Sequence, residues 1–322
     1  MRLGLNLNTF LPEPLGASTI LPLFALTAVL GIARAQDAAI TAARTLPLPA
    51  PIPDRYGLFN LLDHRSRYAT NRYPEPLLSD EMDWDQEIRL DWFHAEKRGI
   101  QGDEVHGEVE FSFGLLTLEV GVPYERNSQQ TVDPITGEAG HDRSEGIGSI
   151  ELAARHPVYQ YVSSDGFFDF TLGARLEVAV PSGSDVGKNT EIVPGLYAVT
   201  GFGEHLSLQT SVAYSALFGP GDDGGLRTLE YAAVLGWRIN HNELPLPSVQ
   251  CVFPIFELDG ELPLNHDDSG IDSLTGVAGF RINFDSIGVG QPKIGLGYAF
   301  PIDNGARQDF NWGIVTSLVL EF

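Results

Sequence analysis

Residues 312–322 alternate apolar side chains with small or polar ones up to a terminal phenylalanine, in the order WGIVTSLVLEF. In an extended chain, Trp312, Ile314 and Phe322 fall on one face, and Gly313 and Glu321 fall on the other. This period of two is expected of a β-strand that separates lipid from a wet lumen. It also suits the last strand of a soluble sandwich, so the fold class needs independent support.

The N-terminal region supplies that support, because it indicates export. Residues 21–32 form an apolar run that is shorter than the ~20 residues of a membrane-spanning helix. Ala33 and Ala35 then provide the small residues that a signal-peptidase site requires. We predict a signal peptide over residues 1–35, with cleavage before Gln36. A single membrane anchor is the alternative.

Composition excludes several classes of function. The net charge of −23 argues against nucleic acid as a partner, because phosphates demand clustered Lys and Arg. The one cysteine, Cys251, excludes an intramolecular disulfide framework. No later stretch reaches the length of a transmembrane helix, and the apolar residues lie in short alternating segments. Such an exported chain can enter a membrane only as a closed barrel, because open sheet edges would leave backbone groups unpaired in lipid.

The chain divides into three predicted parts. After the signal peptide, residues 36–83 form a proline-rich periplasmic arm or a plug of the lumen. Residues 84–322 form an all-β, antiparallel, up-and-down transmembrane barrel of about 12 strands. The predicted strands lie near 85–94, 104–113, 115–125, 147–159, 167–181, 191–202, 206–217, 227–239, 249–263, 274–284, 292–302 and 311–322.

Loop lengths and prolines predict which rim faces outward. Residues 126–146, 219–226 and 265–272 are longer acidic loops on one side, and bacterial barrels carry their longer loops outside. Four odd-numbered predicted strands close with a proline, which would place all four at one rim. We predict that this rim is extracellular. The prolines are Pro123, Pro181, Pro263 and Pro301.

Ionisable side chains share one face of each predicted strand, and this face cannot contact lipid. We therefore predict a lumen lined by Glu87, Arg89, Asp91, His106, Glu108, Glu110, Glu119, Glu151, Arg155, Asp169, Arg175, Glu177, Glu230, Arg238, Arg281, Lys293 and Glu321. Aromatic residues near strand ends suit the girdles at the two membrane interfaces, although scattered core aromatics are the alternative. They are Tyr124, Tyr159, Phe168, Tyr214, Trp237, Tyr298 and Trp312.

Two interpretations of the mixed lumen charges remain open. Opposite charges on neighbouring strands can pair and hold the wall, as Glu151 and Arg155 could with Arg175 and Glu177. Alternatively, the excess of acids tunes a pore and favours cations or neutral solutes over anions.

Three phrases resemble the outer-membrane proteins of the phenol-degradation meta-pathway transporter family. They are FGLLTLEVGVPY at 113–124, GIGSIEL at 146–152 and LEVAVPSG at 176–183, in the family's order. Ser149 stands where the family usually has Asp. The resemblance covers residues 87–322 and implies a barrel of about 12 strands that passes small or hydrophobic compounds, with no catalytic residues to carry over. The terminal strand also resembles that of outer-membrane barrels, whose assembly machinery reads the final aromatic residue, here Phe322.

Enzymatic and metal motifs are missing from the sequence, so we predict no enzyme, no cofactor and no metal site. The best metal candidate is the acidic loop from His266 to Asp272, which lacks the full calcium-loop spacing. Some twelve-stranded barrels are lipid hydrolases with a lipid-facing Ser and His, and His156 is predicted on the lipid face.

The predicted protein is a channel of the bacterial outer membrane. It would pass small solutes, hydrophobic ones included, by passive or facilitated passage. The alternatives are a non-conducting barrel that acts as a scaffold or surface-loop binder, a lipid hydrolase, and a soluble exported sandwich. The predicted partners are outer-membrane lipid, the barrel-assembly machinery and a small solute of unknown identity.

Overall fold

The computed structural model describes residues 73–79, 82, 86–97, 100–132, 139–184, 186–219, 225–265, 269–288 and 290–322. The predicted signal peptide, and the predicted arm as far as residue 72, lie outside the described residues.

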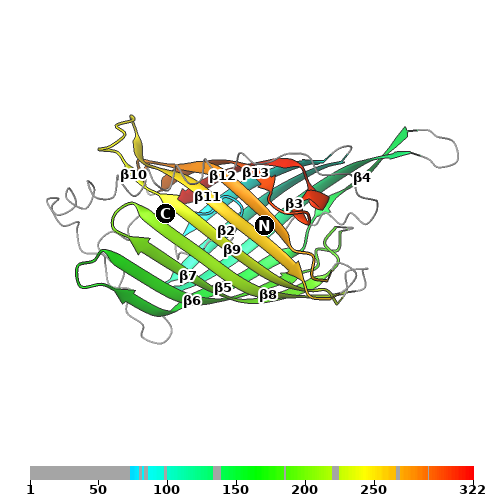
Figure 1. The fold of residues 1–322 in the computed structure, drawn as a ribbon, viewed down its shortest axis with the longest axis horizontal. Coiled ribbons are helices and arrows are strands. Elements are labelled where there is room, and N and C mark those ends of the chain that lie inside the picture. The colour runs from blue at the N-terminus through cyan, green and yellow to red at the C-terminus, as the bar shows by residue number, and fades with distance from the viewer. Residues whose placement is uncertain are drawn as a thin grey trace. The chain divides into compact units, whose positions relative to one another are not determined.

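Within the described residues, twelve antiparallel strands form a closed ring (Figure 1). Consecutive strands of the ring are also neighbours in the sheet, so the topology is up-and-down. The strands are β1 (Glu87–Lys97), β2 (Ile100–Phe113), β3 (Leu116–Val132), β5 (Ile150–Val162), β6 (Phe168–Val180), β7 (Thr190–Phe202), β8 (Leu206–Phe218), β9 (Arg227–Trp237), β11 (Val249–Pro263), β12 (Ser273–Phe284), β13 (Gln291–Pro301) and β14 (Trp312–Glu321). The predicted fold class is confirmed.

The terminal strand closes the ring. β14 pairs with β1 from Glu87↔Glu321 to Glu96↔Trp312, and the Phe322 N–H donates to the Gln86 carbonyl at 2.8 Å. β9 pairs with β11 across the 237–249 connection. No strand of this ring therefore keeps an open edge, and this removes the unpaired backbone groups that lipid would not tolerate.

In the part of the chain that the structure describes, three smaller elements lie off the ring. They are β4 (Ala139–Ile147), β10 (Ile239–Asn240) and α2 (Ala306–Asp309). β4 pairs with β3 in a hairpin that projects past the barrel rim (Figure 1).

The β3–β4 hairpin corrects two predictions. The predicted loop 126–146 is mostly strand, and Pro123 lies within β3 rather than at its end. The alternation of apolar and polar residues does not reveal the hairpin, because it is polar on both faces, with Arg126 opposite Glu145. Pro181, Pro263 and Pro301 do lie at or just past strand ends, and we call that end of the barrel the proline rim. The end where β1 begins and β14 stops is the terminal rim.

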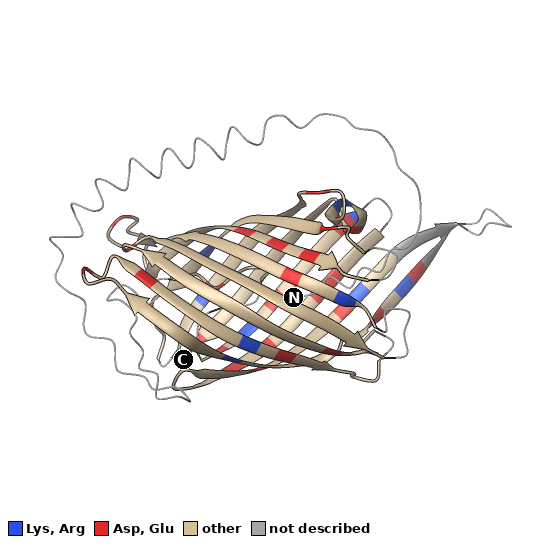
Figure 2. Ribbon diagram, turned by 60° about the horizontal axis from the view of Figure 1, so that its bottom comes forward, with Lys and Arg blue, Asp and Glu red and all other residues tan. Residues whose placement is uncertain are grey.

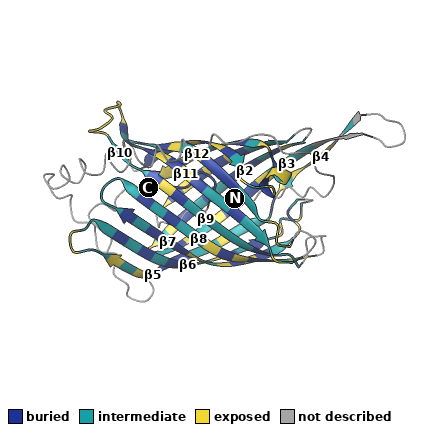
Figure 3. Ribbon diagram, in the orientation of Figure 1, coloured by how far each residue is buried: buried dark blue, intermediate teal, exposed yellow. Residues whose placement is uncertain are grey.

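Burial alternates along the strands (Figure 3). On β1, Glu87, Arg89 and Asp91 are buried, whereas the side chains of Ile88 and Leu90 are 49% and 48% exposed. Each of the remaining ring strands also exposes at least one large apolar side chain. An apolar exterior with buried charges is the reverse of a water-soluble protein, and it matches a wall between lipid and lumen.

Two groups of adjacent rings lie near the rims, where the girdle interpretation places aromatic residues. Toward the proline rim, the His94 ring lies between Trp92 and Trp312, with ring centroids 5.8 and 5.6 Å away. At the terminal rim, His205 stacks on Trp237 at 5.2 Å. Among the described residues, no helix is long and apolar enough to span a membrane.

A cation on the lipid face tests this orientation of the wall. Leu196 lies at the middle of β7 and is 50% exposed. We expect Leu196→Arg to lower the free energy of unfolding in lipid vesicles by ~2–4 kcal/mol, because a cation would then contact hydrocarbon. Urea titration measures the change. Leu244→Arg, in the exposed turn after β10, is the matched control and should cost under ~0.5 kcal/mol. Equal costs would contradict a lipid-facing exterior.

Candidate functional site in the barrel lumen

The interior of the barrel has an apolar sector and a charged sector. Phe93, Phe253, Ile255, Val277 and Val315 belong to one buried apolar cluster, which lies on β1, β11, β12 and β14. No member of this cluster lies on β2, β5 or β6, where the buried side chains are mostly acids and bases, and we call this part the charged sector. Buried charges also lie beside the apolar cluster, on β1, β11, β12 and β13. Figure 2 shows how charged residues are spread over the strands. The two sectors present different chemistry to anything that occupies the lumen.

Residues 73–79, which we call the inner segment, lie against the apolar sector. Every residue of the segment is buried, and Leu77 and Leu78 belong to the apolar cluster. Its sequence, YPEPLLS, suits an irregular chain, because a residue that precedes proline is held in extended conformations. Pro74 and Pro76 also carry no N–H, so the segment brings fewer backbone donors into the interior.

Wall side chains satisfy the backbone of the inner segment. The Gln209 amide donates to the Pro74 carbonyl at 2.6 Å, and Arg281 Nε donates to the Glu75 carbonyl at 3.0 Å. The Pro76 carbonyl accepts from Arg89 at 2.9 Å and from Arg281 at 2.8 Å. An unpaired buried backbone group costs about as much as a lost hydrogen bond, so these contacts stabilise the segment in place.

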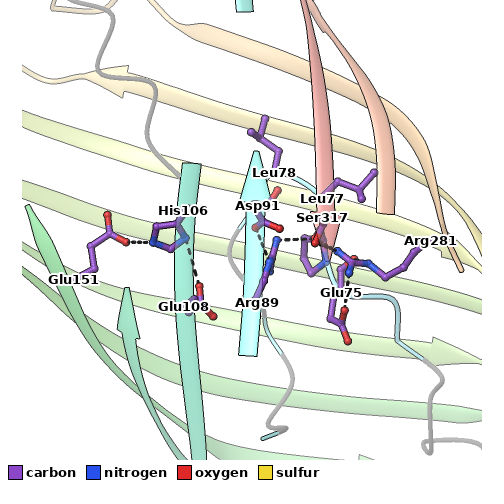
Figure 4. Close-up of polar contacts among 12 residues, drawn as sticks. Glu75, Leu77, Leu78, Arg89, Asp91, His106, Glu108, Glu151, Arg281 and Ser317 are labelled. Carbon is purple, nitrogen blue, oxygen red and sulfur yellow. Dashed lines mark hydrogen bonds and ion pairs between the residues drawn. The ribbon is translucent and has the colours of Figure 1, made fainter. Parts of the chain in front are cut away.

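The Glu75 carboxylate is held by two wall cations. Arg281 Nη1 lies 2.8 Å from Glu75 Oε2, and Lys293 pairs with Glu75 Oε1 (Figure 4 shows Arg281 and Glu75). Lys293 also pairs with Glu321 at 2.6 Å. We call Arg281 and Lys293 the cationic clamp. The cationic clamp joins β12 and β13 to Glu75, which does not belong to the ring.

The Glu257 carboxylate on β11 accepts the donors at the other end of the inner segment. The N–H of Leu77 donates to Oε1, and those of Leu78 and Ser79 donate to Oε2 at 3.0 and 3.2 Å. Glu257 is fully buried, so these N–H groups replace the water that would otherwise solvate its charge.

Glycines in the wall make room for Leu77. A Cβ at Gly295 would lie 2.5 Å from Leu77 Cδ2, and one at Gly279 or Gly297 would lie 2.6 or 2.9 Å from Leu77 Cδ1. Gly279 and Gly297 face each other on β12 and β13. The wall therefore has a recess that a leucine side chain fills.

In the charged sector, bases and acids pair within the wall. Arg155 bridges Glu110 and Glu119, and lies 3.3 Å from the latter. Arg175 pairs with Glu177 on the same strand at 2.6 Å. His106 contacts Glu151 at 3.0 Å and Glu108 at 3.8 Å (Figure 4). These contacts correspond to the wall-bracing interpretation of the mixed charges.

A cavity of about 40 Å³ lies beside these pairs, toward the proline rim. Its ionisable lining is acidic except for one arginine: Glu151, Arg175, Glu177, Glu230, Asp259 and Glu261. Arg281, Lys293 and Glu257, which bind the inner segment, do not line the cavity. Ala232 does line it and belongs to a buried cluster with Tyr73 of the inner segment.

The structure places the predicted lumen residues as follows. Glu87, Arg89, Asp91, His106, Glu108, Glu110, Arg155, Asp169, Glu177, Arg281 and Lys293 are buried on ring strands, and Glu119, Glu151, Arg175, Glu230 and Glu321 are partly buried on them. Arg238 directly follows β9. Their role in lining a pathway remains a proposal.

The sequence interpretation did not single out Glu75, Gln209 or Glu257 as site residues. Strict alternation from Phe253 and Ile255 along β11 would have placed Glu257 on the inward face. No local signal predicts that Glu75 meets Arg281 from a position about two hundred residues earlier in the chain.

Candidate metal and hydrolase residues were also located. Carboxylate oxygens of Glu87, Glu108 and Glu110 lie within 4.8 Å of one another, but Arg155 already compensates this group through Glu110. Residues 266–268 of the acidic loop lie outside the described residues. His156 pairs with Ala174 in the register and is only 8% exposed, which leaves little of it for a lipid substrate.

The closed ring, its apolar exterior and its charged interior define a transmembrane β-barrel of the bacterial outer membrane. No protein-family model and no curated protein matches the chain. The predicted phenol-degradation family therefore stays a prediction.

Solved structures share the architecture at low sequence identity. An outer membrane channel from Pseudomonas putida F1 is 14% identical with a TM-score of 0.49, and the match covers 78% of this chain and 100% of that one. The NanC porin is 10% identical with a TM-score of 0.41, and the match covers 74% of this chain and 98% of that one. Outer membrane phospholipase A from Escherichia coli is 10% identical with a TM-score of 0.34, and the match covers 74% of this chain and 98% of that one. We base the functional argument on the barrel itself.

A methyl group at position 295 tests how the inner segment is seated. In Gly295→Ala the new Cβ would clash with Leu77, whereas its nearest wall atoms would be 3.3 and 3.5 Å away. Overpacking costs ~1–3 kcal/mol, so we expect the segment to loosen. Cys251, buried in the same cluster as Leu77, should then react roughly tenfold faster with a small thiol reagent.

Gly107→Ala is the matched control, because a Cβ there meets nothing within 4 Å. Its labelling rate should equal that of the wild type. Unchanged labelling in Gly295→Ala would contradict the seating of Leu77 in the glycine recess.

Proposed function

We propose that this protein is an outer-membrane channel for passive or facilitated passage of small solutes, hydrophobic ones included. The observation that carries the proposal is the division of the lumen. The inner segment packs against the apolar sector, while a polar cavity lies among β5, β6, β8, β9 and β11, toward the proline rim. A barrel of this strand number lies between eight-stranded barrels with filled interiors and sixteen-stranded porins with open water channels.

The charge of the cavity suggests which ions pass most readily. Its acids outnumber its one arginine, and rings of acidic side chains favour cations over anions in pores. We therefore propose a pathway through this cavity that prefers cations and neutral solutes. The family resemblance adds hydrophobic compounds to this class, and membership in that family is part of the proposal.

The main alternative is a barrel that stays closed and serves as a scaffold or surface-loop binder. The observation that favours it is the number of strands tied by the inner segment, whose contacts reach β1, β8, β11, β12 and β13. Solute flux separates the two functions.

Liposome flux is the direct test. We expect purified protein in liposomes to pass small sugars or ions, and deletion of residues 36–83 to raise the rate, because the inner segment would no longer occupy the apolar sector. Swelling assays and single-channel recording measure this. A scaffold predicts no flux from either protein, and that result would reject the channel.

Charge removal in the cavity tests the selectivity. In the double variant Glu230→Gln and Glu261→Gln, the reversal potential in a salt gradient should move toward that of an unselective pore, since two lining acids become neutral. Glu243→Gln, which removes a more exposed acid in the turn after β10, is the control. An anion-selective wild type, or equal shifts in both variants, would contradict the assigned pathway.

A further inference from the structure

Arg281 depends on the inner segment for its counter-charge. Its side chain is 0% exposed, and among the described residues its ion-pair partner is Glu75. Ser317 on β14 supplies a neutral hydrogen bond at 3.1 Å. The neighbouring cations differ, because each also has a carboxylate within the ring: Arg89 pairs with Asp91 at 2.6 Å and Lys293 with Glu321.

This arrangement limits how the inner segment can leave. A guanidinium stays charged in proteins, and a buried charge without a partner is strongly destabilising. Glu257, which would lose its N–H donors at the same time, differs because a carboxyl group can become neutral by taking up a proton. Departure of the segment therefore leaves Arg281 to be compensated by lumen water or by another anion, and an anion restores the lost ion pair.

The wall next to the clamp is shaped for an aliphatic group. Gly295 has Leu77 as its closest neighbour and Arg281 as another, with 3.5 Å between its ideal Cβ position and Arg281 Cζ. The recess and the clamp are thus adjacent parts of one wall. Glu75 and Leu77 present a carboxylate and a branched aliphatic group to them together (Figure 4).

We propose that the cationic clamp and the glycine recess form a binding site for small carboxylates with a branched aliphatic body, and that Glu75 and Leu77 occupy it as a tethered mimic of the solute. This inference deepens the proposed function, because it names a class of solute. A carboxylate that takes the clamp replaces the charge of Glu75 at Arg281, so the inner segment is released by exchange.

The position of the clamp fits this class of ligand despite the acidic cavity. Arg281 and Lys293 lie near the ends of β12 and β13 at the terminal rim, and the cavity lies toward the proline rim. A carboxylate that enters from the terminal rim reaches the clamp without passing the cavity, and the nearest rim acid, Glu321, is already paired with Lys293.

The test uses the full chain and isocaproate, a branched aliphatic carboxylate. Glu75→Gln keeps the shape of the mimic but removes its charge, so isocaproate should bind this variant about tenfold more tightly than the wild type in detergent micelles. Isothermal titration calorimetry measures the binding. Isohexyl alcohol, which has the same body without the carboxylate, should bind neither protein.

Second-site variants locate the binding. Adding Lys293→Met or Arg281→Met to Glu75→Gln should abolish isocaproate binding, whereas adding Arg143→Gln, on the exposed β4, should not change it. Gel mobility of unheated samples shows which variants form a folded barrel, and Lys293→Met serves if Arg281→Met does not fold. The proposal is overturned if folded Glu75→Gln does not bind isocaproate, binds the alcohol equally well, or loses binding through Arg143→Gln.

Flux and binding separate this inference from the proposed function. Binding to Glu75→Gln without flux in liposomes would reject the channel and keep the site. Flux through the wild type with no isocaproate binding to Glu75→Gln would keep the channel and reject the site.

Discussion

Closure of the sheet is the constraint on which the other features depend. Each strand end and edge in hydrocarbon must have its backbone groups paired, and the pairing of β1 with β14 satisfies the last of them. The ring then fixes which face of each strand is inside. All ionisable side chains of that face meet in one enclosed space, where each must find a partner or water. The pairings in the lumen are consequences of that enclosure.

The interior meets this requirement in two ways. The charged sector supplies its own counter-charges, because Arg155 pairs with Glu119 on the neighbouring strand β3 and with Glu110 on β2, and Arg175 pairs with Glu177 on its own strand. The apolar sector instead relies on the inner segment. The Glu75 carboxylate pairs with Arg281, and backbone N–H groups of the segment donate hydrogen bonds to Glu257. A structural element that supplies the missing partner of a wall residue is also one that a solute can replace. This physical difference is the basis for the ligand site that we propose in the apolar sector.

Strand number sets the scale of the pathway. A barrel of this strand number lies between eight-stranded barrels, whose interior is filled by wall side chains, and sixteen-stranded porins, which hold an open water channel. The inner segment occupies the part of the interior that borders the apolar cluster, and the polar cavity remains toward the proline rim. The proposed pathway therefore runs through the polar cavity, beside a peptide that is held by hydrogen bonds and ion pairs.

The sequence alone determined the fold class, the approximate strands and the two faces of the wall, because the period of two is a local property of each strand. Thus Glu87, Arg89 and Asp91 were predicted on one face of β1, and the structure buries all three. The β3–β4 hairpin escaped prediction, since a hairpin outside the lipid needs no apolar face. Only the tertiary structure decided that the proline-rich inner segment lies against the apolar sector and that Glu75 meets Arg281 and Lys293. Contacts between residues about two hundred positions apart depend on ring closure and on the register of every strand between them, and no local pattern carries that information.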